Sequence, residues 1–255
     1  MTLIKNKIPI LEYDDNPCAV LMPAHERLNI HLPEKAVFVF LGECVEAYAH
    51  LEKAEKVAEF ISITKKYPIY VLTYEGEEIC LCQAPMGAAA STQILDWLIG
   101  YGVKKVIAAG SCGTLEEIPE NVFLVPMKAL RDEGTSYHYI PPSRYIEMNQ
   151  EALLSIKKTF EKWKLSYVEC VTWTTDGFYR ETQEMVCYRK EEGCMVVEME
   201  CAALAACAQF RGICFGQILF TADTLADVED YRERWFGEAS FEIAMRICMD
   251  IIHAM

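Results

Sequence analysis

The chain has 255 residues, of which 52% are hydrophobic, and its 24 basic and 38 acidic side chains give a formal net charge of −14 at pH 7. This length and apolar content suffice to bury a sizeable core, and the acidic balance argues against nucleic acid or an anionic membrane as a partner. No apolar run approaches the roughly 20 residues of a membrane span, and the N-terminal segment lacks the apolar core of a signal peptide. We therefore expect a cytoplasmic protein.

Apolar runs rich in β-forming residues alternate with helical patterns along the chain. The expected strands are Ala19–Met22, Ala36–Leu41, Ile69–Tyr74, Ile79–Gln83, Val106–Ala109, Val122–Val125, Tyr167–Thr172, Met195–Met199 and Cys214–Phe220. The expected helices are Ala47–Thr64, Ala90–Tyr101, Glu151–Trp163, Thr182–Glu192, Cys201–Phe210 and Trp235–Ala254. The segment Tyr70–Gln83 is expected to form a hairpin around Glu75-Gly76-Glu77.

Near-continuous apolar strands suit a sheet that is buried on both faces. Their alternation with helices predicts an α/β fold with a mostly parallel central sheet. Because the sequence shows no linker and no internal repeat, we interpret residues 1–255 as a single domain. The 12 cysteines and five histidines lack metal-ligand spacing, so we expect reduced, mostly buried thiols and no bound metal.

The stretch from Val196 to Leu204 is the most informative in the chain, because two glutamates lie between a β-branched run and an alanine-rich helix. A carboxylate at such a strand-to-helix junction is well placed to accept two hydrogen bonds from the vicinal diol of a ribose. Glu198 and Glu200 would share one face of the strand. The alternative is a solvated charged pair beside the positive end of the helix dipole.

Ligands of α/β sheets bind at the carboxyl ends of strands. Five segments are expected at such ends: Pro23–Arg27, Met86-Gly87, Gly110–Gly113, Glu198–Glu200 and Thr221–Asp223. In Gly110-Ser111-Cys112-Gly113 the glycines allow close backbone approach, and Ser111 offers a hydroxyl and an N–H to an anion. An ordinary tight turn explains this segment equally well.

Taken in order, the motifs resemble the nucleoside phosphorylase-I family, which includes purine nucleoside phosphorylase, uridine phosphorylase and methylthioadenosine/adenosylhomocysteine nucleosidase. The matching segments are Ala19–Arg27, Pro85-Met86-Gly87, Gly110-Ser111-Cys112-Gly113, Asp176-Gly177-Phe178-Tyr179, Val197-Glu198-Met199-Glu200-Cys201-Ala202 and Thr221-Ala222-Asp223. The resemblance implies one α/β domain with a twisted central sheet flanked by helices. It also implies cleavage of the N-glycosidic bond of a nucleoside through an oxocarbenium-like transition state.

The resemblance also implies roles for individual residues. Glu200 would grip the ribose diol, Phe178 would stack on the base, and Asp223 would donate a proton to the leaving purine from a raised pKa. The remaining residues expected around the ribose and base are Met86, Cys112, Gly113, Val197, Glu198 and Met199. Without the family context, Phe178 is as well explained as an ordinary core residue, and Asp223 has a helix-cap or turn role as its alternative.

The prediction of which base the protein recognises depends on Asp223 and on the absence of one motif. Uridine phosphorylases lack this Asp and use a Gln-x-Arg pair shortly after the Phe-Tyr element. Residues 180–184, Arg-Glu-Thr-Gln-Glu, hold no such pair in register. The sequence therefore favours a purine base, with uridine phosphorylase as an alternative.

The phosphate site departs from the family pattern. Arg27, Ser111 and Gly110 are expected to hold phosphate, but proline replaces the loop glycine at Pro23 and the arginine before the Gly-Ser turn is missing. Because phosphate recognition relies on bidentate arginine, phosphate would bind weakly or through stand-ins. The stand-ins are His25, Arg131 and His138. Glu26 lies near the point where family nucleosidases carry the glutamate that activates water.

The first hypothesis is a nucleoside phosphorylase, a pentosyltransferase that releases the base and ribose-1-phosphate with phosphate as co-substrate and no cofactor. The alternatives are a nucleosidase of the methylthioadenosine/adenosylhomocysteine type that uses water, and a catalytically silent nucleoside-binding protein. The resemblance also implies a homo-oligomer, a dimer or a hexamer.

Overall fold

The structure is a computed structural model, and it describes residues 3–255. The strands are β1 (Lys35–Val39), β2 (Glu55–Ile61), β3 (Lys66–Tyr74), β4 (Glu77–Gln83), β5 (Lys105–Thr114), β6 (Phe123–Asp132), β7 (Tyr145–Glu147), β8 (Tyr167–Thr175), β9 (Val196–Glu198) and β10 (Cys214–Thr224). The helices are α1 (Cys44–Leu51), α2 (Ala88–Gly100), α3 (Gln150–Trp163), α4 (Gln183–Glu191), α5 (Cys201–Arg211) and α6 (Phe241–Ala254). Short 3-10 turns are η1 (Pro9–Leu11), η2 (Ser136–His138), η3 (Phe178–Arg180) and η4 (Glu238–Ser240).

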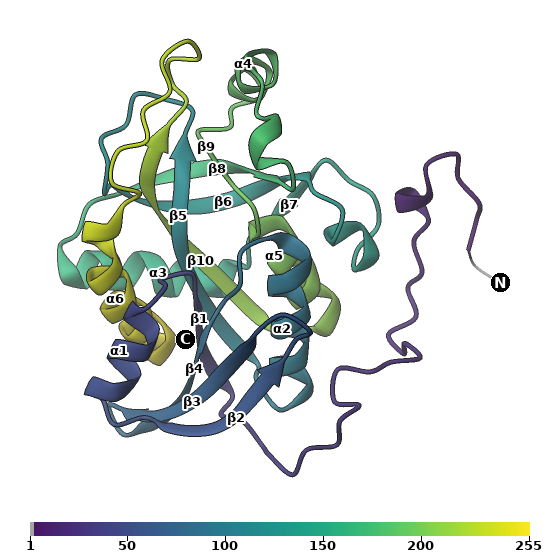
Figure 1. Cartoon of the computed structure of the whole chain (residues 1–255), viewed down its shortest axis with the longest axis vertical. Helices are drawn as coiled ribbons and strands as arrows, with labels where there is room; N and C mark the ends of the chain where they lie inside the picture. Colours follow the sequence, from purple (N-terminus) through teal and green to yellow (C-terminus); the bar gives the residue numbers. More distant parts are fainter. Residues whose placement is uncertain (1–2) are drawn as a thin grey trace.

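All ten strands of residues 3–255 belong to one sheet, in which β5 pairs with β1, β9 and β10. Because β10 also pairs with β6, and β6 leads through β8 to β9, the strands β5, β10, β6, β8 and β9 close into a ring. Strands β1, β4, β3 and β2 extend the sheet outward from β5 (Figure 1). The site described below lies at the carboxyl ends of β1, β4, β5 and β10.

The prediction of a single-sheet α/β fold is confirmed, but its mostly parallel character is wrong. In the described residues five strand pairings are parallel and five are antiparallel. Tight connections between β2, β3 and β4 force antiparallel neighbours, and closure of the ring adds the antiparallel contacts β5–β9 and β6–β10. The alternation of strands and helices along the sequence does not determine which strands become neighbours in the sheet.

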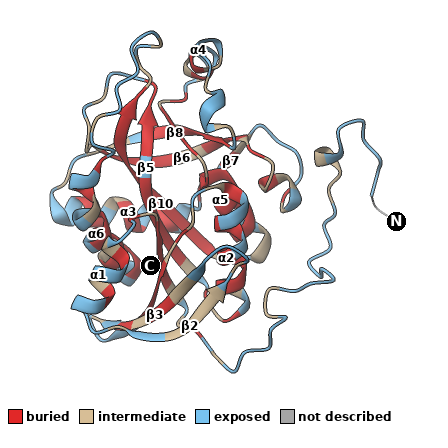
Figure 2. Cartoon of the chain, in the orientation of Figure 1, coloured by how far each residue is buried: buried red, intermediate tan, exposed pale blue. Residues whose placement is uncertain are grey.

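Helices cover the sheet and close the core. α2 packs against α5, while α6 packs against α3, β1 and β5. α5 is buried along most of its length because it is rich in alanine, which lets neighbouring elements approach closely. Figure 2 shows the burial running along β5, β8 and β10 and through α5. None of the helices in residues 3–255 combines the length and the apolar content that crossing a bilayer requires.

Three secondary-structure predictions differ from the structure. The helix expected over Ala47–Thr64 ends at Leu51, where Lys53 adopts a left-handed φ of 53°, and β2 follows as a strand paired with β3. About half of the residues in β2 are apolar, and their order fits both a helix and a strand. Pairing with β3 makes this segment a strand. The strand expected over Ala19–Met22 has no pairing partner, and the helix expected from Trp235 begins only at Phe241.

The hairpin prediction is confirmed: β3 and β4 pair around Glu75 and Gly76, which have positive φ angles of 48° and 85°. The N-terminal arm, residues 3–33, runs along the outside of the body before β1 (Figure 1). Most of it is exposed (Figure 2). Tyr13 donates a hydrogen bond to the Tyr139 carbonyl, and Trp97 on α2 donates one to Glu26.

Candidate active site

A cavity of about 370 Å³ lies where the strand ends converge. The carboxyl ends of β1, β4, β5 and β10 form its floor, the β9–α5 junction forms one wall, and η3 closes another side. The lining residues are Phe40, Gln83, Ala84, Met86, Gly110, Ser111, Cys112, Gly113, Phe178, Glu181, Glu198, Met199, Glu200, Gln217, Asp223 and Phe236. Four of the five segments expected at strand ends therefore meet here.

Glu200 is the N-cap residue of α5 and is 7% exposed. The Gly87 N–H donates a hydrogen bond of 2.5 Å to its Oε1 atom, and Gly87 has a φ of 96° that favours glycine. Burial, and then the charge of Glu198, raises the pKa of Glu200 to about 8. No hydrogen bond from a described residue reaches its second oxygen, so that oxygen is free to accept one from a diol.

Glu198 has a different task from Glu200. Its Oε1 accepts hydrogen bonds from the hydroxyls of Thr172 and Thr174, and its Oε2 accepts them from the N–H groups of Glu200 and Cys201. Burial raises its pKa while these donors oppose the change. Glu198 therefore lines the cavity, but both of its carboxylate oxygens accept hydrogen bonds from within the protein. Two of these bonds hold the first turn of α5, which positions Glu200.

Asp223 lies at the end of β10 and is 7% exposed. The Tyr231 hydroxyl donates a hydrogen bond of 3.1 Å to its Oδ2 atom. Burial raises the pKa of Asp223, and the Tyr231 hydrogen bond and the Arg234 charge partly oppose this. A Cβ at Gly113 would lie 3.0 Å from Leu225 and 3.3 Å from Asp223 Oδ1, so a side chain at position 113 would crowd Asp223.

Glu181 is a site residue that sequence reasoning missed. It follows η3, and burial together with the Asp223 charge raises its pKa to about 7. It lines the cavity together with Phe178, Asp223 and Phe236, and the same four residues also line an adjoining cavity of about 510 Å³. Phe178 and Phe236 are 46% and 41% exposed, so their rings are available to a flat ligand.

The Gly110–Gly113 segment lies within β5 rather than in a tight turn. The ring of Phe40 packs over Gly110, where a Cβ would lie 3.2 Å from the ring. Ser111 is exposed to the cavity, whereas the Cys112 thiol is buried and bonds the Phe220 carbonyl. Burial raises the pKa of Cys112 well above its usual value, so this thiol is no nucleophile.

The two methionines and Val197 differ in placement. Met86 is 78% exposed at the rim of the cavity, and Met199 lines it in a partly buried position. Val197 is not among the lining residues, because its side chain packs with Trp173 and Leu130 in the core. The expected ribose contact of Val197 therefore has no support in the structure.

Arg27 does not reach this cavity. The N–H of Leu28, the next residue, donates a hydrogen bond to the hydroxyl of Tyr101, the C-cap residue of α2. Met86 and Gly87 lie at the amino end of the same helix, and a helix of 13 residues is about 20 Å long. The expected pairing of Arg27 with Ser111 and Gly110 is thus not formed within this chain.

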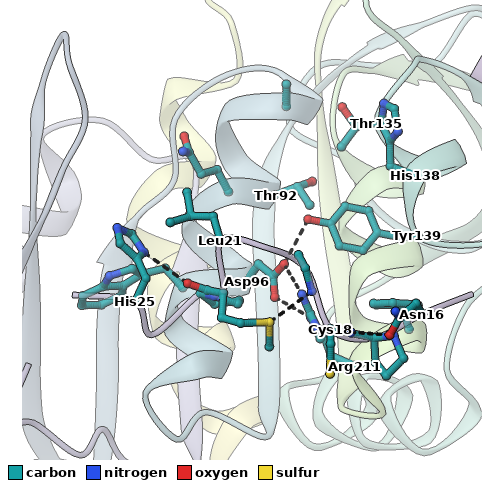
Figure 3. A pocket seen from close by; sticks show the side chains of 18 of the residues that line it. Asn16, Cys18, Leu21, His25, Thr92, Asp96, Thr135, His138, Tyr139 and Arg211 are labelled. Carbon is teal, nitrogen blue, oxygen red and sulfur yellow. Dashed lines mark hydrogen bonds and ion pairs between the residues drawn. The ribbon is translucent and has the colours of Figure 1, made fainter. Parts of the chain in front are cut away.

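The three stand-ins for phosphate binding also lie elsewhere. Arg131 is 3% exposed and donates to Ser136, Ser143 and the carbonyl of Pro141. His25 and His138 line a separate cavity of about 670 Å³ between the N-terminal arm, α2 and η2 (Figure 3). Neither the 370 Å³ cavity nor its 510 Å³ neighbour has a lysine or arginine among its lining residues.

The fold is that of known nucleoside-cleaving enzymes. A uridine phosphorylase structure from Vibrio fischeri has a TM-score of 0.76 and 22% identity over 89% of this chain and 95% of that chain. An AMP nucleosidase structure from Bacteroides thetaiotaomicron has a TM-score of 0.70 and 21% identity over 87% of this chain and 88% of that chain. A purine nucleoside phosphorylase of the DeoD type from Bacillus cereus is 29% identical over 183 residues, covering 68% of this chain and 76% of that protein.

The chain belongs to the phosphorylase superfamily, whose family model matches residues 34–254. The family resemblance drawn from the motifs is thereby confirmed. The superfamily comprises enzymes that include nucleoside phosphorylases and nucleosidases. The N-terminal arm lies outside the matched residues.

Proposed function

We propose that this protein cleaves the N-glycosidic bond of a purine nucleoside with water as the nucleophile. The observation that carries the proposal is the charge of the cavity: Glu181, Glu198, Glu200 and Asp223 line it, and no lysine or arginine does. A phosphate dianion needs cationic or multiple N–H partners to leave water, whereas water carries no charge that these carboxyls would repel. We therefore propose hydrolysis rather than phosphorolysis as the reaction.

Each residue has a place in this reaction. The free oxygen of Glu200 would bind the ribose diol, and the rings of Phe178 and Phe236 would hold the base. Asp223, whose pKa is raised by burial, would donate a proton to the departing base. A purine is favoured because its N7 accepts such a proton, in keeping with the role that the resemblance gives to Asp223.

Phosphorolysis is the second candidate, and the observation in its favour is that sequence relatives are named purine nucleoside phosphorylase and guanosine phosphorylase. It would need a cation from a second copy of the chain, brought to the exposed rim at Ser111 and Met86. A uridine phosphorylase and a silent nucleoside-binding protein are the remaining possibilities that the same assay separates.

The test is base release from inosine, adenosine, uridine and methylthioadenosine, each measured with and without phosphate. Release of a purine without phosphate, unchanged by its addition, is the expected result. We expect Asp223→Asn to slow this release about 100-fold or more, because an amide cannot donate the acid proton at neutral pH. Release that requires phosphate would overturn hydrolysis, and nucleoside binding without release would mean that the protein only binds.

A further inference from the structure

A second cavity continues from the candidate active site on the side of Asp223. Its volume is about 510 Å³, and the residues that line both it and the 370 Å³ cavity are Phe178, Glu181, Asp223 and Phe236. Its other lining residues are Tyr179, Gln183, Val186, Leu225, Asp227, Val228, Tyr231 and Glu233. Because Phe178, Asp223 and Phe236 are the residues proposed to hold or protonate the base, the second cavity begins where the base would lie.

Hydrogen bonds hold the walls of this second cavity in place. α4 lies on one side, and the Gln183 side chain at its start donates a hydrogen bond to the Val228 carbonyl in the loop that follows β10. Two backbone hydrogen bonds between Thr224 and Arg232 close that loop. The loop is therefore attached both to α4 and to the end of β10, and the space between these elements is part of the fold.

Aromatic and apolar side chains make up most of the lining of the second cavity. Four of them are large aromatic residues that remain exposed, namely Phe178, Tyr179, Tyr231 and Phe236. Exposed apolar surface that gathers at a cavity is typical of a ligand site, because covering it with a ligand removes that surface from water. The second cavity is therefore suited to an apolar group rather than to a strongly hydrated one.

The structure of a purine determines which of its atoms faces the second cavity. N7 and the exocyclic group at position 6 lie on the same edge of the ring. If Asp223 donates its proton to N7, the group at position 6 lies beside Asp223, where the two cavities meet. Position 8 also adjoins N7 but faces the sugar, and position 2 lies on the far side of the ring. A substituent at position 6 can therefore enter the second cavity while Glu200 binds the ribose.

We propose that the second cavity is a subsite for an apolar substituent on the exocyclic amine of the base, so that the preferred substrate is an adenosine with a bulky group on its 6-amino nitrogen. This inference rests on the purine specificity proposed above and names the substrate class. At the junction, Glu181 offers an acceptor to the N–H that the substituted amine retains. Asp227 and Glu233 line the cavity without any lysine or arginine, so an anionic substituent is disfavoured.

The test compares 6-benzylaminopurine riboside with adenosine as substrates of the full chain. We expect kcat/KM to be about 10- to 100-fold higher for the benzyl compound, because its phenyl ring leaves water on entering the cavity. Adenosine with a benzylamino group at position 2 is the matched control and should show no gain. A 4-carboxybenzyl group on the 6-amino nitrogen should lose most of the gain, because it brings a negative charge beside Asp227 and Glu233. Equal kcat/KM values for adenosine and the benzyl compound would overturn the proposal.

Val228→Phe fills part of the subsite. Val228 lines the second cavity but not the 370 Å³ cavity. We expect this variant to lower kcat/KM for the benzyl compound about 10-fold more than kcat/KM for adenosine. Ile63→Phe adds similar bulk at an exposed position between β2 and β3, and it should leave the ratio of the two kcat/KM values unchanged. Thermal melting shows which variants are folded, and the comparison of substrates on the wild-type protein depends on neither variant.

Binding of the free bases separates this inference from the proposed function. In isothermal titration calorimetry, 6-benzylaminopurine should bind about 10- to 100-fold more tightly than adenine, whichever nucleophile the enzyme uses. If purines are released without phosphate but the two bases bind equally, the subsite is overturned while hydrolysis stands. If release requires phosphate but 6-benzylaminopurine still binds more tightly, hydrolysis fails and the subsite stands. If only uridine is cleaved and neither purine base binds, the purine specificity fails and the subsite fails with it.

Discussion

Four carboxyl groups line the cavity, and their surroundings give them different tasks. The Glu198 carboxylate accepts four hydrogen bonds, Glu200 has one oxygen free to accept a ligand, and Asp223 accepts one side-chain hydrogen bond, from Tyr231. Burial and the Asp223 charge raise the pKa of Glu181 to about 7, and burial raises the pKa of Asp223. The pair therefore favours a bound proton near neutral pH.

This proton predicts a pH dependence. An acid catalyst is active while protonated, so activity falls as pH rises through its raised pKa. Replacing Glu181, whose own pKa is about 7, by glutamine removes a negative charge beside Asp223. We expect Glu181→Gln to lower the pKa of Asp223 and to move the alkaline limb of the kcat/KM profile to lower pH. An unmoved limb would mean that Asp223 is not the group that titrates.

The sequence predicts some of the site residues but not others. Glu200 and Asp223 follow strands in recognisable motifs, and the structure brings them into one cavity. Glu181 was missed because burial beside Asp223 gives it its raised pKa, and no motif records burial. Arg27 matches the arginine of the family's phosphate loop and would follow a strand at Ala19–Met22, but the strand end that reaches the site is that of β1, followed by Phe40.

At the scale of elements, α5 shows how a helix start builds a site. Its first N–H groups are unsatisfied by the helix itself, and Glu198 accepts from Cys201 and from the N-cap residue Glu200. Thr174 ties this arrangement to β8, because its hydroxyl donates to Glu198 and accepts from the Ala202 N–H. The position of Glu200 thus depends on three elements.

Glu198→Gln tests this dependence. The amide retains one acceptor but turns its NH₂ group toward hydroxyls or N–H donors that previously met an oxygen. We expect a loss of about 1–3 kcal/mol in the free energy of unfolding, measured by urea denaturation. The matched control is Glu169→Gln, an exposed glutamate on β8, which should change the stability by less than about 0.5 kcal/mol. Equal losses of stability in the two variants would contradict the capping role of Glu198.

The helices α2, α3, α4 and α5 were predictable to within a few residues, whereas strand pairing decided the rest. β2 became a strand only through its partner β3, and β5 and β10 extend beyond the expected strands because they pair along their whole length. The closed ring could not be foreseen either. Its defining contact, β5 with β10, joins segments more than a hundred residues apart, such as Ala108 and Gln217.

At the scale of the whole molecule, hydrogen bonds from Tyr13, Trp97 and Arg211 tie the N-terminal arm to the body. Arg211, paired with Asp96, donates one hydrogen bond to the Pro17 carbonyl, and Tyr139 donates to the same aspartate (Figure 3). Val20 and Leu21 on the arm are exposed apolar residues. We propose that the homo-oligomer expected from the family covers part of this surface, which sedimentation of the full chain would test.

Arg211→Ala should loosen the arm. It removes the hydrogen bond to Pro17 and leaves Asp96 without its ionic partner. We expect limited proteolysis to cut within the arm several times faster than in the wild type, because a tethered segment opens less often. Lys104→Ala, which removes only an exposed ion pair with Glu34, is the control and should leave the cutting rate unchanged.

The closed ring has a consequence for how the chain is made. β10 is the last strand of the described residues, so the edges of β5 and β6 that it covers stay open until residues 214–224 have left the ribosome. Open strand edges invite pairing with other nascent chains, and contacts between distant segments form slowly. A protein truncated before Cys214 would therefore aggregate rather than accumulate as a smaller folded unit.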